Sequence, residues 1–209
     1  MAFGDLTTLD DVKIWLQTGQ TPFPDTDDVL LARLITAASR FIQAWLNRQI
    51  ALADYLEVRD GTGGDRLQFA CVPVVAVLSL TIDGQPIEPA ASHRAGYNFS
   101  RTQLSVRGYR FCRGVQNVVM AYKAGYPAPP PDIAQACIEL VALRYRERTR
   151  IGEVSKSLGG AETVTYAQTD LGAAIKSLLR QYRLVSPVAG FRPVVTSAGA
   201  DAAIIAGAL

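Results

Sequence analysis

The stretch 27-DDVLLARLITAASRFIQAWLNRQI-50 decides the architecture of the N-terminal part of the chain. Apolar residues recur in it at the 3–4-residue spacing of one helix face, over about five turns. Thr26 precedes it as an expected N-cap, and Asp27 and Asp28 place negative charge in the first turn, where it suits the helix dipole. We therefore predict a long amphipathic helix whose buried face is formed by Leu30, Leu31, Leu34, Ile35, Ala38, Phe41, Ile42, Trp45 and Leu46.

A shorter helix is predicted upstream, over residues 8–17. Thr8 is its expected N-cap, and Asp11 follows three residues later, close to the spacing of a capping box. The apolar face of this helix is expected to consist of Val12, Trp15 and Leu16.

Two further helices are predicted after the central part of the chain. Pro131 suits the first helical position, and a periodic apolar pattern continues from it to about Thr149. A Gly-, Ser- and Thr-rich stretch over 151–168 follows as a loop or loose hairpin. The fourth helix is expected over Asp170–Arg183.

Between these helices the apolar period changes from helical to two, which is typical of strands. Asp83-Gly84 is a two-residue hairpin signal, and residues 89–102 are polar and irregular. We expect about six short antiparallel strands, over 55–59, 67–70, 74–82, 86–88, 103–107 and 117–122.

The predicted fold class is therefore α+β. Residues 1–52 and 126–185 form a bundle of about four helices, and residues 53–125 form an inserted antiparallel β-sheet domain. Residues 186–209 form an extended tail with too few large apolar groups for a core element. That tail is either a segment that folds by docking on a partner or a disordered terminus.

Charge is distributed unevenly although the formal net charge is only +2. Residues 1–90 carry 6 basic and 12 acidic side chains, residues 94–156 carry 11 and 4, and residues 157–209 carry 4 and 3. Such a molecule either stacks head to tail with its own copies, turns one face to a polyanion, or has uneven surface charge with no partner. The near-balanced total argues against a strongly basic nucleic-acid binder.

No catalytic or metal-binding constellation is found. The one histidine, His93, lies in a polar loop without a nucleophile motif, and the glycine-rich stretch 61–64 lacks the lysine of a phosphate-binding loop. Cys71, Cys112 and Cys137 are far apart, so we expect three buried thiols in a reducing compartment. We expect no enzyme activity, cofactor or metal.

Membrane insertion and secretion are not expected either. The N-terminal residues lack the basic and apolar regions of a signal peptide. No run reaches the ~18 apolar residues of a membrane span.

Two groups of arginines are candidate interaction residues. Arg144, Arg148 and Arg150, with Arg146, lie at the end of the helix that starts at Pro131, where they either complement the helix dipole or contact phosphate or an acidic protein. The second group alternates with aromatic residues and favours a subunit interface over nucleic acid. It consists of Arg107, Arg110 and Arg113, beside Tyr109 and Phe111.

The order of these motifs resembles a known family. The segments are LTTLDDVKIWL (6–16), the helix over 27–50, VPVVAVLSLTIDGQPI (72–87), YKAGYPAPPPDIAQACIELVALRYRERTRIG (122–152) and SLGGAETVTY (157–166). Together they resemble the head–tail connector (adaptor) proteins of tailed bacteriophages, in the longer form with a β insertion that also occurs in prophages and gene transfer agents.

The resemblance implies a structural, non-enzymatic protein of the virion neck, made in the cytoplasm of a bacterial host. It implies a homo-oligomeric ring of about twelve subunits below the portal protein. The ring carries double-stranded DNA onward without sequence specificity and offers a platform to the next neck or tail (stopper) protein. No membrane partner is implied.

The resemblance also implies roles for particular residues. The tail is expected to dock on the portal through Phe191, Arg192, Val194, Val195, Ile204 and Ile205. The channel wall or a subunit contact is expected at Arg144, Arg148, Arg150 and Lys156, and a further subunit contact at Arg107, Arg110 and Arg113. Ring neighbours are expected to place the acidic N-terminal part against the basic middle segment, so assembly should weaken with salt.

A different class of function stays open from the residues alone. The basic segment 94–156 also suits a nucleic-acid-binding module, whose affinity for DNA falls steeply with salt.

Overall fold

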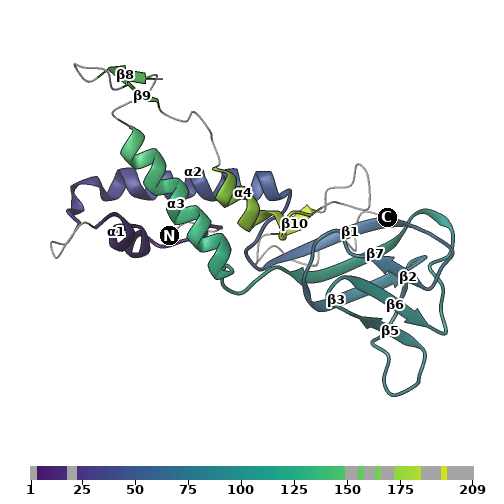
Figure 1. Cartoon of the computed structure of the whole chain (residues 1–209). Helices are drawn as coiled ribbons and strands as arrows, with labels where there is room; N and C mark the ends of the chain where they lie inside the picture. Colours follow the sequence, from purple (N-terminus) through teal and green to yellow (C-terminus); the bar gives the residue numbers. More distant parts are fainter. Residues whose placement is uncertain are drawn as a thin grey trace. The chain divides into compact units, whose positions relative to one another are not determined.

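The computed structural model describes residues 4–17, 23–148, 155–157, 163–165, 172–184 and 194–196 (Figure 1). The chain divides into two compact units. The helical unit comprises residues 1–50 and 129–184, and the sheet unit comprises residues 51–128 and 185–209. The four α-helices and the antiparallel sheets of the described residues confirm the predicted α+β class.

Helix α1 (Leu9–Leu16) begins as predicted at Thr8, whose Oγ1 accepts a hydrogen bond from the backbone N–H of Asp11 at 3.1 Å. Val12 and Leu16 are buried, but Trp15 is 47 % exposed, so its expected place on the apolar face is wrong. An eight-residue helix buries a narrow stripe here, at positions i and i+4, and Trp15 lies about 100° around the helix from Leu16.

Helix α2 (Asp28–Leu46) is the predicted long amphipathic helix. A 3₁₀ turn, η1 (Asp25–Asp27), precedes it, so Asp27 rather than Thr26 is the N-cap residue. The backbone N–H of Leu6 donates to Ser39 Oγ on α2 at 3.0 Å, which holds the N-terminal segment on this helix. The buried apolar face consists of Leu31, Ile35, Ala38, Ile42 and Leu46.

The stretch Asp25–Leu46 is long and apolar enough, by length and composition alone, to cross a membrane. The stretch is not an unbroken run of ~18 apolar residues, because Arg33 and Arg40 interrupt it, so the expectation that no such run occurs is not contradicted. A third of its most apolar window (33 %) is buried inside the protein. Within the helical unit, α2 packs against α1 and α3.

Helix α3 (Pro131–Glu147) starts at Pro131 as predicted, and α4 (Ala173–Arg180) is shorter than the expected 170–183. The residues after α4 hold three helices together. Tyr182 Oη donates to Asp132 in the first turn of α3 at 3.0 Å, and the backbone N–H of Leu184 donates to the carbonyl of Leu46 at the end of α2 at 3.0 Å. The hairpin β8 (Ser155–Ser157) and β9 (Thr163–Thr165) lies between α3 and α4 in the sequence.

The sheet unit contains a five-stranded sheet of order β10-β1-β7-β3-β4 and a three-stranded sheet of order β2-β6-β5. All the pairs are antiparallel. The strands are β1 (Ala53–Gly61), β2 (Arg66–Gln68), β3 (Val74–Ile82), β4 (Gln85–Pro86), β5 (Gly96–Phe99), β6 (Gln103–Arg107), β7 (Gly114–Ala124) and β10 (Val194–Thr196).

The predicted hairpin forms between β3 and β4, with positive φ angles of 53° at Asp83 and 76° at Gly84, as a type I′ turn requires. Strand β5 lies in the stretch that we expected to be irregular. Gly96, at its start, has φ +154°, and a Cβ there would lie 2.6 Å from the carbonyl oxygen of Glu88. The backbone near Glu88 therefore comes close to Gly96, where β5 begins. Because β5 has only four residues, its alternation of apolar and polar side chains is too short to be recognised in the sequence.

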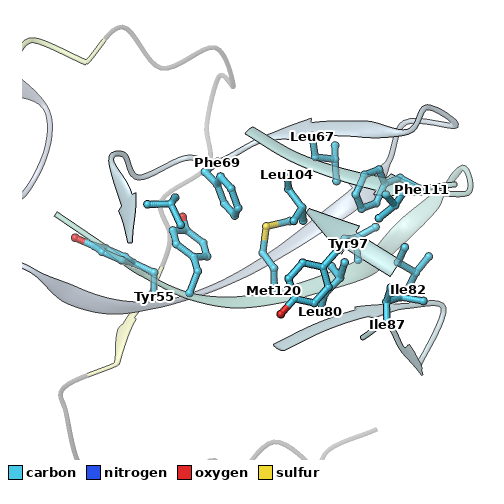
Figure 2. Packing of buried hydrophobic residues seen from close by; sticks show 14 of the residues in the cluster. Tyr55, Leu67, Phe69, Leu80, Ile82, Ile87, Tyr97, Leu104, Phe111 and Met120 are labelled. Carbon is cyan, nitrogen blue, oxygen red and sulfur yellow. The ribbon is translucent and has the colours of Figure 1, made fainter. Parts of the chain in front are cut away.

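The two sheets share one hydrophobic core (Figure 2). Met120 from the five-stranded sheet and Leu104 from the three-stranded sheet are both fully buried in it. Phe111, from the loop between β6 and β7, is fully buried in the same core and so fixes that loop to the sheets.

Candidate interaction surfaces

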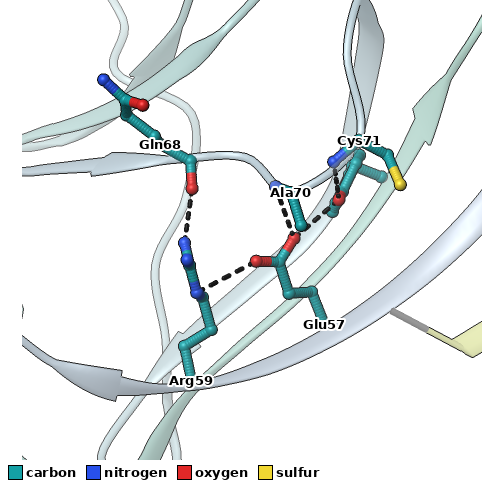
Figure 3. Close-up of polar contacts among 6 residues, drawn as sticks. Glu57, Arg59, Gln68, Ala70 and Cys71 are labelled. Carbon is teal, nitrogen blue, oxygen red and sulfur yellow. Dashed lines mark hydrogen bonds and ion pairs between the residues drawn. The ribbon is translucent and has the colours of Figure 1, made fainter. Parts of the chain in front are cut away.

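A buried carboxylate, Glu57 on β1, joins the two sheets from within (Figure 3). Its oxygens receive a hydrogen bond from Tyr122 Oη at 2.6 Å and one from the backbone N–H of Ala70 at 3.3 Å. Arg59 Nε lies 3.1 Å from the second carboxylate oxygen, and the same guanidinium donates to the carbonyl of Gln68 on β2.

Burial raises the pKa of Glu57 above its ordinary value, and the contacts with Tyr122, Arg59 and Ala70 oppose that rise. Burial also raises the pKa of Tyr122 far above its ordinary value, with the Glu57 charge as the next cause. The Glu57 side chain has no exposed area, so the network holds strands together and has no access to a substrate. Sequence analysis missed it, because an alternating strand gives no sign that an acidic residue faces inward.

The end of α3 is held to the start of α2 by Asp27. Tyr145 Oη donates to the Asp27 carboxylate, and Arg148 Nη2 lies 3.4 Å from the same oxygen. The Arg148 guanidinium also stacks on the Tyr145 ring at 3.8 Å from its centroid. Burial, and then the hydrogen bond to Asp27, raise the pKa of Tyr145.

Two of the four arginine and lysine residues expected at the channel wall are thus engaged inside the helical unit. Arg148 binds Asp27, and the Arg144 guanidinium lies 5.1 Å from the centroid of the Phe41 ring on α2. Arg150 lies outside the described residues, and of Lys156 only the backbone, in β8, is described. For Arg144 and Arg148, these contacts favour the interpretation that the side chains interact within their own helical unit over contact with phosphate or with another protein.

The loop between β6 and β7 has the opposite character. We call the exposed side chains of this loop and of the strand ends that flank it the tip surface: Arg107, Tyr109, Arg110, Arg113 and Val115. Tyr109 is 45 % exposed and Val115 is 84 % exposed. Within the part of the chain that the structure describes, the three arginine side chains form no ion pair.

The loop that carries the tip surface is held in place by its own backbone. The N–H of Phe111 donates to the carbonyl of Gly64 at 2.9 Å, and the N–H of Gly63 donates back to the carbonyl of Phe111 at 2.6 Å. A Cβ on Gly63 would lie 3.3 Å from the Arg113 side chain, which therefore lies close against this turn. An open hollow at the tip is lined by Gly64, Asp65, Val106, Arg107, Gly108, Tyr109 and Arg110.

A second exposed surface lies on α1. We call it the α1 outer face: Asp10, Asp11, Ile14 and Trp15. Ile14 is 70 % exposed and Trp15 is 47 % exposed, and both acidic side chains are exposed as well. Residues 10 and 14, and 11 and 15, are four positions apart, so the acids and the apolar side chains share one side of the helix. Sequence analysis missed this surface because it placed Trp15 in the core.

The tail residues expected to dock on the portal are described in part. Val194 and Val195 belong to β10, which pairs with Leu56 and Tyr55 of β1. Phe191, Arg192, Ile204 and Ile205 lie outside the described residues.

The single histidine and the three cysteines lie in different parts of the fold and do not form a common site. His93 is exposed, with φ 72°, in the loop before β5. The expectation of three buried thiols is wrong for Cys112, which is exposed, and for Cys71, which is half-buried, because both lie in loops between strands. Cys137 on α3 is buried, and burial raises its pKa to about 11. Among the described residues, no three His, Cys, Asp or Glu side chains are grouped as a metal site.

Comparisons with known proteins agree with this fold. A family model described as "Head completion protein" matches residues 5–185. A chain of the "Virion of native gene transfer agent (GTA) particle" superposes with a TM-score of 0.55 at 20 % identity, covering 91 % of this chain and 95 % of that chain. A chain of the "Neck of empty GTA particle computed with C6 symmetry" gives 0.53 at 19 % identity, with the same coverage. No curated protein matches the chain.

Proposed function

This chain belongs to the head completion protein family, and from that premise we propose that it is a structural protein of the neck of a tailed phage or phage-like particle. The family match over residues 5–185 carries the proposal. The shared fold supports it, because both superposed chains come from gene transfer agent particles and one of them comes from a neck. The role is one of assembly and requires no catalysis.

In this proposal the chain forms a ring of about twelve copies below the portal protein. The ring extends the DNA channel and gives the next neck or tail (stopper) protein a place to attach. The sixfold symmetry of the superposed neck is compatible with that number, because a ring of twelve has sixfold symmetry.

The C-terminal tail is proposed to contact the portal. Val194 and Val195 pair with Leu56 and Tyr55 of β1, and this ability to add a strand to a sheet supports a strand-addition contact with a partner. The proposed contact residues are Phe191, Arg192, Val194, Val195, Ile204 and Ile205.

The test is binding of the purified full-length chain to the purified portal protein of the same particle, followed by native mass measurement and negative-stain images. We expect a ring of this chain on the portal. A chain that stays monomeric in the presence of the portal contradicts the proposal. Deleting residues 186–209 removes the edge strand β10 and should weaken portal binding, and circular dichroism checks that the remaining chain stays folded.

A second candidate function is binding of nucleic acid by the basic segment 94–156. The arginines of the tip surface, which form no ion pair among the described residues, favour it. It predicts an affinity for DNA that falls steeply with salt. It also predicts weaker binding after Arg144→Ala and Arg148→Ala, although the structure engages both residues inside the helical unit. Absent or salt-insensitive binding by the monomer excludes it.

A further inference from the structure

We propose that the tip surface of one copy docks on the α1 outer face of the next copy, and that this contact closes the ring. The inference rests on the ring of the proposed function and names the two surfaces that build it. It is carried by the complementary chemistry of two exposed surfaces on different units of the chain.

The residue composition of the tip surface suits a contact with another protein better than a purely electrostatic contact with a phosphate backbone. Tyrosine and arginine are enriched in the residues that dominate binding energy at interfaces. Tyr109 and Val115 expose apolar area beside three unpaired arginines. A phosphate backbone would bind the arginines, but it would leave Val115, 84 % exposed, without an apolar partner.

The loop is also ordered before any partner arrives. Phe111 is fully buried beneath it, and the paired hydrogen bonds with Gly63 and Gly64 fix its backbone. A surface that is already in place loses little conformational entropy on binding, which favours association.

The α1 outer face offers the complementary groups in the same arrangement. Ile14 and Trp15 supply exposed apolar area, and Asp10 and Asp11 supply negative charge beside it. Asp10 forms no ion pair among the described residues, so its charge is available to a partner.

Other acids of the N-terminal part are less available. Lys13 Nζ lies 2.5 Å from Asp25 and 2.6 Å from Asp28, and Arg148 binds Asp27. Asp54 lies 3.5 Å from Lys123. These contacts engage four other acids of the N-terminal part, whereas Asp10 and Asp11 lie exposed beside Ile14 and Trp15.

A second copy of this chain is the occupant that these observations favour. The tip surface and the α1 outer face are different patches, so their contact is heterologous, and repeating it generates a ring when the rotation closes. The two surfaces carry charges of opposite sign, because the tip surface has three arginines and the α1 outer face has two aspartates. The contact is therefore expected to weaken as salt shortens the Debye length from about 10 Å at 0.1 M.

The first experiment maps the contact directly. A photoreactive benzoylphenylalanine replaces Tyr109 in the full-length chain, and rings assembled on the portal are irradiated, digested and analysed by mass spectrometry. We expect crosslinks to the peptide that contains α1 of another copy. Rings whose crosslinks fall elsewhere overturn this inference and leave the proposed ring intact. Absence of any ring overturns both.

The second experiment tests the charges by exchange. Arg110→Glu and Asp10→Arg are each expected to weaken ring assembly about tenfold or more, and the double variant is expected to recover most of the loss. Arg40→Glu, at an exposed position on α2, is the matched control and should assemble like the parent chain. All four chains are first compared by circular dichroism and urea unfolding, so that assembly is judged only on folded protein. Two losses that add in the double variant overturn the inference.

Discussion

The end of α3 and the tip surface both carry arginines that the sequence marks as candidate interaction residues, yet the fold places the two groups in different surroundings. Arg148 reaches Asp27, 121 residues earlier in the chain, and stacks on Tyr145. The arginines of the tip surface reach no acid among the described residues. The comparison teaches that arginines clustered in the sequence differ in whether the fold gives them an internal partner, and that only the structure separates the two cases.

The largest expected effect on the free energy of unfolding concerns the Glu57 network, in which the charged groups are fully engaged inside the protein. Glu57→Ala leaves the Arg59 side chain, 9 % exposed, without its carboxylate and should lower the free energy of unfolding by about 3–5 kcal/mol. Urea unfolding measures this. Arg107→Ala at the tip surface should change the same quantity by less than about 0.5 kcal/mol. If Glu57→Ala does not fold, Tyr122→Phe is the second variant. It removes the hydrogen bond to the carboxylate and the one that Tyr122 Oη accepts from the Cys71 N–H, and should cost about 1.5–3 kcal/mol. Equal values for Arg107→Ala and the network variants would break the comparison.

The cysteines allow a reactivity test of the same two regions. Cys112 lies in the exposed loop, and Cys137 is buried on α3 with a pKa raised from 9.0 to about 11. Because the thiolate is the reactive form, the raised pKa alone should slow labelling of Cys137 by about a hundredfold at neutral pH. Maleimide labelling of the folded chain, followed by peptide mass analysis, measures both rates. Cys112→Ser is the control and should remove the fast phase.

A smaller effect is expected at the joint between α2 and α3. Asp27→Ala removes the partner of both Tyr145 and Arg148, and should lower the free energy of unfolding by about 1–2 kcal/mol, because the groups are half-exposed. Arg110→Ala should cost less than about 0.5 kcal/mol. Similar urea midpoints for the two variants would show that the α3 arginines are as free as those of the tip surface.

The smallest expected effect is the pH dependence from Glu57. Its pKa is raised in the folded state, mainly by burial, so the stability that it contributes is complete below its ordinary pKa of 4.5. That contribution is lost as the pH rises through the raised value. Glu57→Gln does not titrate, so the parent chain should lose stability relative to this variant as the pH rises from 4 to 7. A constant difference between the two free energies of unfolding across this range would contradict the raised pKa.

The elements that could be predicted from sequence are those with local causes. The apolar period over 27–50, the Thr8 cap and the Asp83-Gly84 turn each depend on residues within a few positions of one another. These features appear in the structure where the sequence placed them.

The features that could not be predicted depend on partners far along the chain. Glu57 is buried because Tyr122, 65 residues later, donates to it. Trp15 is exposed because α1 buries only Val12 and Leu16. Sequence analysis could therefore group the arginines but could not separate those that the fold satisfies from those that it leaves exposed.

The central claim is that this chain builds a ring in the neck of a phage-like particle. A cryo-EM map of the neck of an intact particle that contains this chain tests it most directly. The account predicts a closed ring of its copies next to the portal, with the β6–β7 loop of each copy on α1 of its neighbour. A neck without density for this chain, or copies that make no contact with one another, would contradict the account.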